Sequence, residues 1–172
     1  MKWILWLFIA LAGFLILITL IGWLLPKDHV ATRQGRYRQP PEAIWTAITD
    51  VDAMPSWRAG LKSVKHLPDK SGLPVHLEVT DSGEIPIETV EMTQPLKLIS
   101  RIADPKLPFG GTWTFEIMPT EGGSTLRITE NGYVTNPVFR FLSRFVFGYA
   151  GSIETYLNSL AKKFDEQPRI EE

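Results

Sequence analysis

The sequence predicts an α+β domain in which an antiparallel sheet packs against a long C-terminal helix, preceded by one transmembrane helix. Three patterns predict this. Residues 3–25 are apolar and uncharged, side chains between residues 61 and 134 alternate with a period of two, and an apolar stripe with helical spacing runs through residues 137–164. We therefore expect an anchor at 1–26, one domain at 28–165 and a polar tail at 166–172.

The opening run is long enough to cross a bilayer, because a hydrocarbon core about 30 Å thick needs roughly 20 apolar residues in a helix. Trp3, Trp6 and Trp23 lie near its two ends, where indole rings prefer the membrane interface, and Pro26 ends the helix. A signal peptide has an apolar core of only about 7–15 residues and a cleavage site with small residues. A buried core helix is the other alternative. We expect residues 3–25 to contact the lipid bilayer.

The charged residues beside this run predict its orientation. Lys2 flanks one end, whereas Lys27, Arg33, Arg36 and Arg38 follow the other end. Positive charge favours the cytoplasmic side of a membrane. The sequence therefore favours a single-pass protein of the plasma membrane with its domain on the cytoplasmic side.

Composition excludes several classes of function. With 18 Lys+Arg against 19 Asp+Glu, the chain has no basic excess for binding nucleic acid. It has no cysteine for a disulfide, a thiol nucleophile or a metal site. We find no nucleophile elbow, phosphate-binding loop or dinucleotide fingerprint, so we expect no cofactor and assign no catalytic residue; a protein partner stays undefined.

The histidines give no metal site. His29, His66 and His76 are scattered along the chain, and His76 with Glu78 would supply only two ligands on one strand face. A zinc site needs at least three protein ligands. Because His76 alternates with apolar Val75 and Leu77, we expect it on a solvated strand face, and we expect no bound metal.

The domain begins with a strand and a helix. Residues 29–39 alternate loosely, and Pro40-Pro41-Glu42 suits the first turn of a helix, which apolar residues at helical spacing continue to Val51. A second short helical piece is expected near Met54–Trp57. The strands that follow are predicted at Leu61–Leu67, Pro74–Asp81, Glu84–Thr93, Leu96–Ala103, Thr112–Met118 and Ser124–Val134. Short turns separate them, which predicts an antiparallel meander.

The last element is predicted as one long helix from Pro137 to Phe164. Its stripe, which must be buried against the sheet, consists of Leu142, Phe145, Tyr149, Ile153, Tyr156, Leu160 and Phe164. Phe139, Phe141 and Phe147 lie off this stripe. They could pack against loops, contact the bilayer or form the rim of a cavity.

A series of short motifs, in this order, resembles the START-like (SRPBCC) superfamily over residues 28–164. The motifs are Pro41–Trp45 with Asp50, Met54–Trp57, Gly111–Phe115, Leu126–Glu130, and the helix from Phe147 to Leu160. The sequence is most similar to the group described as polyketide cyclase/dehydrase and lipid transport. The resemblance implies a helix-grip fold, in which a curved sheet wraps around the C-terminal helix, and a cavity for an apolar small molecule.

Strand parity selects the lining of such a cavity, because alternate side chains share a face. Glu130 and Arg101 each share a face with apolar residues, so each would either orient the polar end of a ligand or lie in water at the sheet edge. The expected lining is Ile99, Arg101, Trp113, Phe115, Ile117, Leu126, Ile128, Glu130, Leu142, Phe145, Tyr149, Ile153 and Tyr156.

These features favour a membrane-anchored binding protein for an apolar small molecule that is lipid-like, quinone-like or polyketide-like. One alternative is an enzyme, a cyclase, dehydrase or hydrolase of aromatic or lipid substrates, in which Glu130 or Tyr133 takes part. A pocket with two convergent titratable groups would support it. Another alternative is a protein-interaction module that uses Phe139, Phe141 and Phe147.

Overall fold

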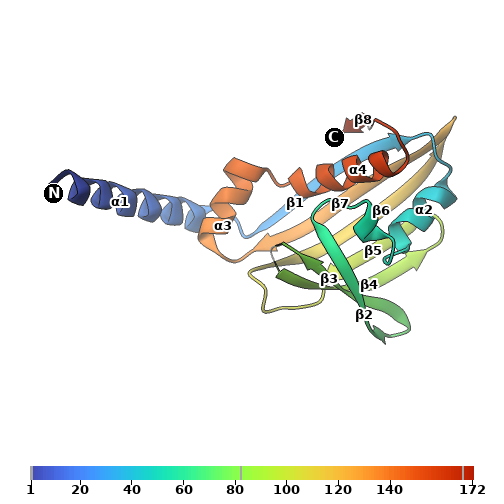
Figure 1. Cartoon of the computed structure of the whole chain (residues 1–172), viewed down its shortest axis with the longest axis horizontal. Helices are drawn as coiled ribbons and strands as arrows, with labels where there is room; N and C mark the ends of the chain where they lie inside the picture. The colour runs from blue at the N-terminus through green and yellow to red at the C-terminus, as the bar shows by residue number, and fades with distance from the viewer. Residues whose placement is uncertain (1, 82, 168) are drawn as a thin grey trace.

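The computed structural model describes residues 2–81, 83–167 and 169–172 of the chain. Its strands form one antiparallel sheet in the order β2-β3-β4-β5-β6-β7-β1-β8 (Figure 1). The helices are α1 (Lys2–Leu24), α2 (Pro41–Thr49), η1 (Met54–Ser56), α3 (Pro137–Leu142), η2 (Ser143–Phe147) and α4 (Gly151–Lys163). The strands are β1 (Asp28–Tyr37), β2 (Leu61–Lys70), β3 (Leu73–Thr80), β4 (Gly83–Thr93), β5 (Lys97–Ile102), β6 (Phe109–Thr120), β7 (Gly123–Val134) and β8 (Arg169–Glu171).

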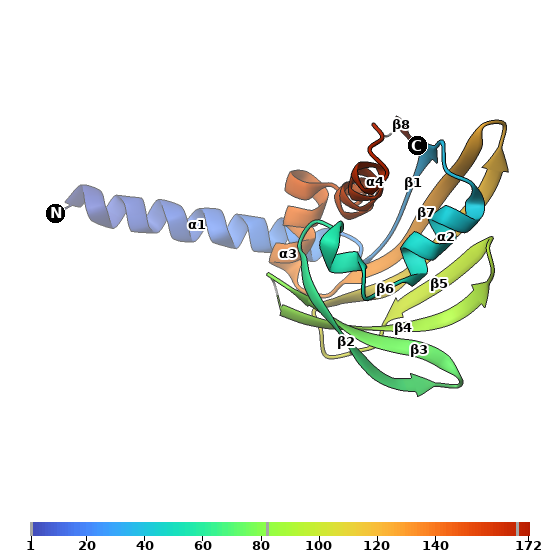
Figure 2. The same ribbon diagram turned by 45° about the vertical axis from the view of Figure 1, so that its right-hand side comes forward.

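The α+β class and the antiparallel meander are confirmed. The sheet is curved, and α2 and α4 lie on its concave side (Figure 2). Proline occupies the first turn of α2, where its missing N–H costs nothing, and the helix buries Ile44 and Ile48. Helix α4 buries Ile153, Leu157 and Leu160, which are fully shielded from solvent. These side chains form the core with the inward side chains of β6 and β7.

The prediction of a single helix from Pro137 to Phe164 is wrong. α3 passes into η2, which is one turn of π-helix, and the chain then breaks at Gly148 before α4 begins at Gly151. Gly148 has φ of +72°, a left-handed conformation that only glycine adopts at low cost. The apolar stripe is therefore interrupted. Phe145 is 59% exposed and points away from the core that α4 builds.

Helix α1 extends away from the domain and contacts it at one end (Figure 1). Among the described residues it is the one helix that is long and apolar enough to cross a membrane, with a mean hydropathy of 2.9. Transmembrane segments and signal sequences share this composition. Gly22, in the last turn of α1, is buried against α3, so the end of α1 packs directly on the domain.

The C-terminal residues, expected as a polar tail, include a strand. Arg169–Glu171 form β8 and pair antiparallel with β1, with Ile170 opposite Gly35. An ion pair of 3.3 Å joins Arg36 to Glu171. β8 therefore covers the edge of the sheet that β1 would otherwise expose.

Candidate functional site

A cavity of about 600 Å³ lies between the concave face of the sheet and the segments α2, η1 and α4. This volume is within the range of about 300–1,000 Å³ that is typical of small-molecule pockets. Much of its wall is apolar and includes Ile85, Ile87, Leu98, Ile102, Trp113 and Phe115.

The register of the sheet explains which side chains face the cavity, because residues paired across two strands point to the same face. Leu98 of β5 pairs with Phe115 of β6, and Ser100 pairs with Trp113. On β5, Leu98, Ser100 and Ile102 therefore face the cavity. The sequence pattern instead predicts that the other face of β5, the one that carries Ile99, lines the cavity.

Five of the expected residues line the cavity: Arg101, Trp113, Phe115, Glu130 and Tyr156. Four more are packed in the core and are at most 2% exposed, namely Ile117, Leu126, Ile128 and Ile153. The remaining four lie elsewhere: Ile99 on the other face of β5, Leu142 in α3, Phe145 in η2, and Tyr149, which stacks on His29 with ring centroids 4.3 Å apart.

Arg101 borders the cavity, but its guanidinium is bound to a carboxylate on the other side of the sheet. Its Nε donates a hydrogen bond of 2.6 Å to Glu88, which also accepts one of 2.6 Å from Lys70 Nζ. Glu88 is 3% exposed, and these two cations hold the pKa of its carboxyl below the ordinary value. The charge of Arg101 is therefore already compensated.

A first polar cluster lies in the cavity wall and consists of Arg58, His76, Glu78 and Tyr156. The expectation that His76 and Glu78 lie on a solvated face is wrong, because they are 7% and 5% exposed. His76 pairs with Ile87 and Glu78 with Ile85, so both side chains of β3 point to the concave face. The alternation along β3 was recognised correctly, but its polar side faces inward.

The charges in this cluster compensate each other. The Arg58 guanidinium contacts the Glu78 carboxylate and lies 5.2 Å from the centroid of the Tyr156 ring. His76 Nε2 is 3.5 Å from Glu78 Oε1. Burial alone would raise the pKa of Glu78, but His76 and Arg58 outweigh burial and hold this pKa below its ordinary value. Burial raises the pKa of Tyr156, whose hydroxyl keeps its proton.

Two members of this cluster have polar atoms that the protein leaves unsatisfied. His76 Nδ1 and the Tyr156 hydroxyl have no hydrogen-bond partner in the part of the chain that the structure describes, and His76 Nε2 has only the 3.5 Å contact with the Glu78 carboxylate. A buried polar atom without a partner costs about 1–3 kcal/mol. Both residues line the cavity, but these atoms themselves expose almost no surface, so a molecule inside the cavity would pair with them only after the two side chains turn toward it.

A second polar cluster surrounds Glu130. Its carboxylate accepts a hydrogen bond of 3.3 Å from Ser152 Oγ and lies 3.6 Å from His29 Nε2. Burial raises the pKa of Glu130, and His29 and Ser152 offset only part of this effect. Tyr133 lies on the other face of β7, three residues further on, with its hydroxyl over Gly110.

Few features of the sequence pointed to the first cluster. Strand β3 is buried on both faces, since Val75 is 9% exposed and His76 is 7% exposed. Alternation cannot show which face of such a strand lines a cavity. The usable signal was the pair His76 and Glu78 on one strand face. Among the described residues, no group of three or more His, Asp or Glu side chains is placed to hold a metal ion.

A curved antiparallel sheet that grips a C-terminal helix, with a cavity between the two, defines a START-like domain. Residues 32–165 match the family described as polyketide cyclase / dehydrase and lipid transport. The chain belongs to this family, which confirms the resemblance seen in the sequence. No curated protein matches the chain significantly.

Solved structures agree with this fold at low sequence identity. A START superfamily protein from Mycobacterium smegmatis has a TM-score of 0.66 and 15% identity, over 80% of this chain and 97% of that chain. Norcoclaurine synthase from Thalictrum flavum has a TM-score of 0.62 and 11% identity, over 81% and 88%. The di-domain ARO/CYC StfQ of the steffimycin biosynthetic pathway has a TM-score of 0.60 and 14% identity, over 81% of this chain and 52% of that chain.

Proposed function

We propose that the chain is a membrane-anchored binding protein for a neutral apolar small molecule that carries a hydroxyl or carbonyl group. The observation that carries this proposal is the cavity of about 600 Å³, whose largely apolar wall also includes the polar residues His76 and Tyr156. Binding of hydrophobic small molecules agrees with the family and with the fold.

The charges around the cavity favour a neutral ligand. Arg58 is paired with Glu78, and Arg101 with Glu88, so neither cation is available to a carboxylate or phosphate. Burial also raises the pKa of the Glu130 carboxyl in the cavity wall, which makes its charged form less favourable there. A carbonyl would accept from the Tyr156 hydroxyl, and a hydroxyl would pair with a His76 nitrogen. Apolar side chains would cover the rest of the molecule.

The junction between α1 and the domain supports a retained anchor rather than a cleaved signal sequence. A Cβ on Gly22 would lie 1.9 Å from the carbonyl oxygen of Pro137. Arg140 is 4% exposed, and its guanidinium donates a hydrogen bond of 2.8 Å to the carbonyl of Leu25. Cleavage would remove both contacts. The proposal places residues 3–25 in the plasma membrane, with the domain of residues 28–165 on the cytoplasmic side.

The test is to purify the full chain in lipid nanodiscs and to identify bound small molecules by mass spectrometry. Ile87→Trp places a large side chain in the cavity, whereas Val90→Trp changes the same strand at a position that is 43% exposed. Wild type and Val90→Trp should carry the same neutral oxygenated compound, and Ile87→Trp should lose it. Equal amounts in Ile87→Trp, or no such compound in any wild-type preparation, would contradict the proposal.

The first polar cluster also favours a second function, an enzyme that moves a proton on the bound molecule. His76 and Glu78 are convergent titratable groups, 3.5 Å apart, at the cavity wall. Norcoclaurine synthase and an ARO/CYC protein share the fold. To test this, the compound purified with the protein is incubated with wild type and with His76→Gln. Conversion by wild type alone, with binding retained in the variant, would support an enzyme; no conversion would leave a binding protein.

A further inference from the structure

The segment formed by α3 and η2 exposes large apolar side chains to an unusual degree. Phe139, Phe145, Val146 and Phe147 are 53%, 59%, 61% and 66% exposed. We call the surface formed by these three phenylalanines and Val146 the aromatic surface. Contiguous exposed apolar side chains mark a contact with a partner or a membrane. The observations below decide between these.

Contacts with the last turn of α1 fix the position of the aromatic surface. Gly22 of α1 is buried directly against Pro137, the first residue of α3. Arg140 of α3 donates hydrogen bonds to the carbonyls of Leu25 and Thr135, at 2.8 and 2.9 Å. Asn136 caps α3 by accepting from two backbone N–H groups. α3 is therefore held beside the end of α1 rather than on a free loop.

The length of α1 sets the depth of this contact in a bilayer. A helix rises about 1.5 Å per residue, so a hydrocarbon core of about 30 Å is crossed by about 20 residues. α1 has 23 residues, so its last turn, which includes Gly22 and Trp23, reaches the membrane interface. α3 packs at this level. The aromatic surface belongs to α3 and to η2, which follows α3 directly. It therefore begins at the level of Trp23, which is 70% exposed and would lie among the lipid headgroups.

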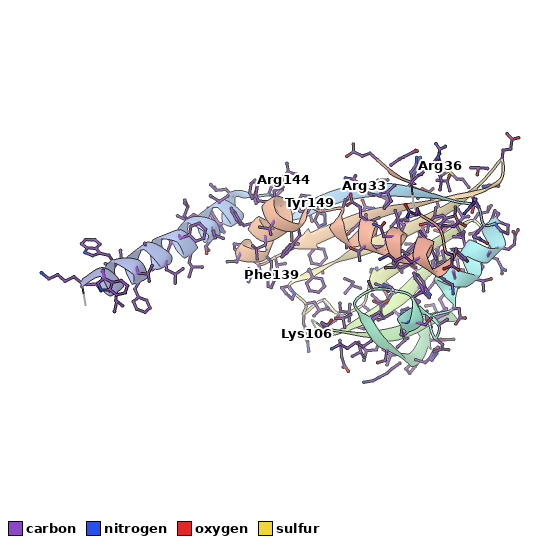
Figure 3. All side chains as sticks on the ribbon, turned by 45° about the horizontal axis from the view of Figure 1, so that its top comes forward. Arg33, Arg36, Lys106, Phe139, Arg144 and Tyr149 are labelled. Carbon is purple, nitrogen blue, oxygen red and sulfur yellow. The ribbon has the colours of Figure 1, made fainter. Side chains whose placement is uncertain are left out.

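The charges nearby suit a phospholipid surface. Between residues 135 and 151 the sequence contains no Asp or Glu, and its charges are Arg140 and Arg144. The exposed Arg144 extends over the ring of Tyr149, 5.6 Å from its centroid. Figure 3 shows Phe139, Arg144 and Lys106 at the end of the domain next to α1. Arg140 is buried, so the exposed base of this segment is Arg144, which lies in a shallow pocket with Asp28. Exposed apolar rings with a basic side chain beside them suit the boundary between acyl chains and headgroups.

On the basis of the proposed anchoring by α1, we infer that the aromatic surface inserts into the interface of the same bilayer. The occupant of this surface is therefore lipid and not a protein. α1 then crosses the membrane, and the aromatic surface keeps the domain in contact with the membrane surface. The domain has two attachments to the bilayer and one fixed orientation.

This orientation brings one end of the cavity to the membrane. Phe109, the first residue of β6, pairs with Val134, which lies three residues before α3. Phe109 is 36% exposed and also lines the cavity. The cavity therefore reaches the end of the domain at which the aromatic surface lies. An apolar ligand dissolved in the bilayer would meet that end first.

The chain is well suited to a direct test because it contains no cysteine. Single cysteines are introduced in the full chain as Phe145→Cys and Phe147→Cys and labelled with a fluorophore whose emission depends on solvent polarity. The protein is reconstituted into vesicles of phosphatidylcholine and phosphatidylglycerol, with and without lipids that carry a quenching nitroxide on the acyl chain. Trp23→Cys reports on α1, and Glu121→Cys, in the exposed turn between β6 and β7, is the water control.

The labels at positions 145 and 147 should show blue-shifted emission and be quenched by the nitroxide lipid to the same extent as the label at position 23. The label at position 121 should show neither effect. Quenching at 23 but not at 145 and 147 would overturn this inference alone, and would leave the aromatic surface free for a protein partner. No quenching at any of the three positions would contradict the anchoring itself.

Discussion

His29 Nε2 lies 3.6 Å from Glu130 Oε1, and the His29 ring stacks on Tyr149 with ring centroids 4.3 Å apart. This contact links the start of β1, which follows α1, to Glu130 in the cavity wall. It also connects β7 with the chain that leads into α4. A single carboxyl group therefore lies where β1, β7 and the segment before the C-terminal helix meet.

The first prediction concerns the protonation of Glu130. Burial raises the pKa of its carboxyl above the ordinary value of 4.5, and His29 offsets only part of this shift. The folded state thus binds this proton more tightly than the unfolded state. The resulting stabilisation is complete below the ordinary pKa and is lost as pH rises through the raised pKa.

Glu130→Gln stays neutral and should not show this loss. Its free energy of unfolding should increase relative to wild type as pH rises from about 4 to about 8, as measured by denaturant titration in detergent. Glu121→Gln, in an exposed turn, is the control and should follow wild type. If wild type instead becomes the more stable protein as pH rises, then Glu130 is stabilised as a carboxylate.

The second prediction concerns the buried ion pair. Glu78 is 5% exposed, and Arg58→Met would leave its charge without a cation, which should cost about 3–5 kcal/mol in the free energy of unfolding. Adding Glu78→Gln should restore most of this loss. Lys65 and Glu84 form an exposed pair, so Lys65→Met should cost at most about 1 kcal/mol. Equal effects of Arg58→Met and Lys65→Met would show that the inner pair is solvated.

The third prediction compares two buried tyrosines. The Tyr37 hydroxyl donates a hydrogen bond of 3.0 Å to the Leu157 carbonyl, and Tyr37→Phe should therefore cost about 0.5–1.5 kcal/mol in stability. The Tyr156 hydroxyl has no partner among the described residues, so Tyr156→Phe should not destabilise the empty protein and should raise its stability by up to about 1–3 kcal/mol.

The amount of compound that co-purifies should show the opposite order. Tyr156→Phe should lower it, and Tyr37→Phe should not, as measured by mass spectrometry of the purified variants. Unchanged ligand content in Tyr156→Phe would show that this hydroxyl takes no part in binding. A large loss of stability in the same variant would show that the hydroxyl has a partner in the folded protein.

The fourth prediction tests the junction between α1 and α3. A Cβ at Gly22 would lie 1.9 Å from the Pro137 carbonyl oxygen, whereas a Cβ at Gly13 meets nothing within 4 Å. Both substitutions to Ala raise helix propensity equally. Gly22→Ala should still cost about 1–3 kcal/mol of stability because the clash is with backbone. Equal melting temperatures of Gly22→Ala and Gly13→Ala in nanodiscs would contradict the packing.

Much of the fold could be predicted because its signals are local. Alternation with a period of two and short polar turns define a meander, and the prolines before Glu42 define the start of α2. The faces of β6 and β7 were also predicted correctly, since Trp113 and Glu130 pair across the two strands and both line the cavity. In these strands, one face is apolar along most of its length.

The rest depended on tertiary contacts that leave no local pattern. β5 and β3 are shielded on both faces to similar degrees, so alternation alone could not show that Leu98 and His76 point inward. The break in the helix at Gly148 was not predicted, because apolar residues before and after Gly148 continue at helical spacing. Phe145 fits this apolar stripe in sequence, yet it lies in the π-helical turn that follows α3 and is 59% exposed.

The connection between the anchor and the domain is short: α1 ends at Leu24 and β1 begins at Asp28. Each residue of an extended chain spans at most about 3.6 Å, so the three intervening residues give a reach of only about 10 Å. Arg140 shortens this reach further by binding Leu25. With α1 in the membrane, as proposed above, a domain tethered so closely would not carry a ligand from one membrane to another. A bound ligand would then pass to the same bilayer or to a molecule that comes to the domain.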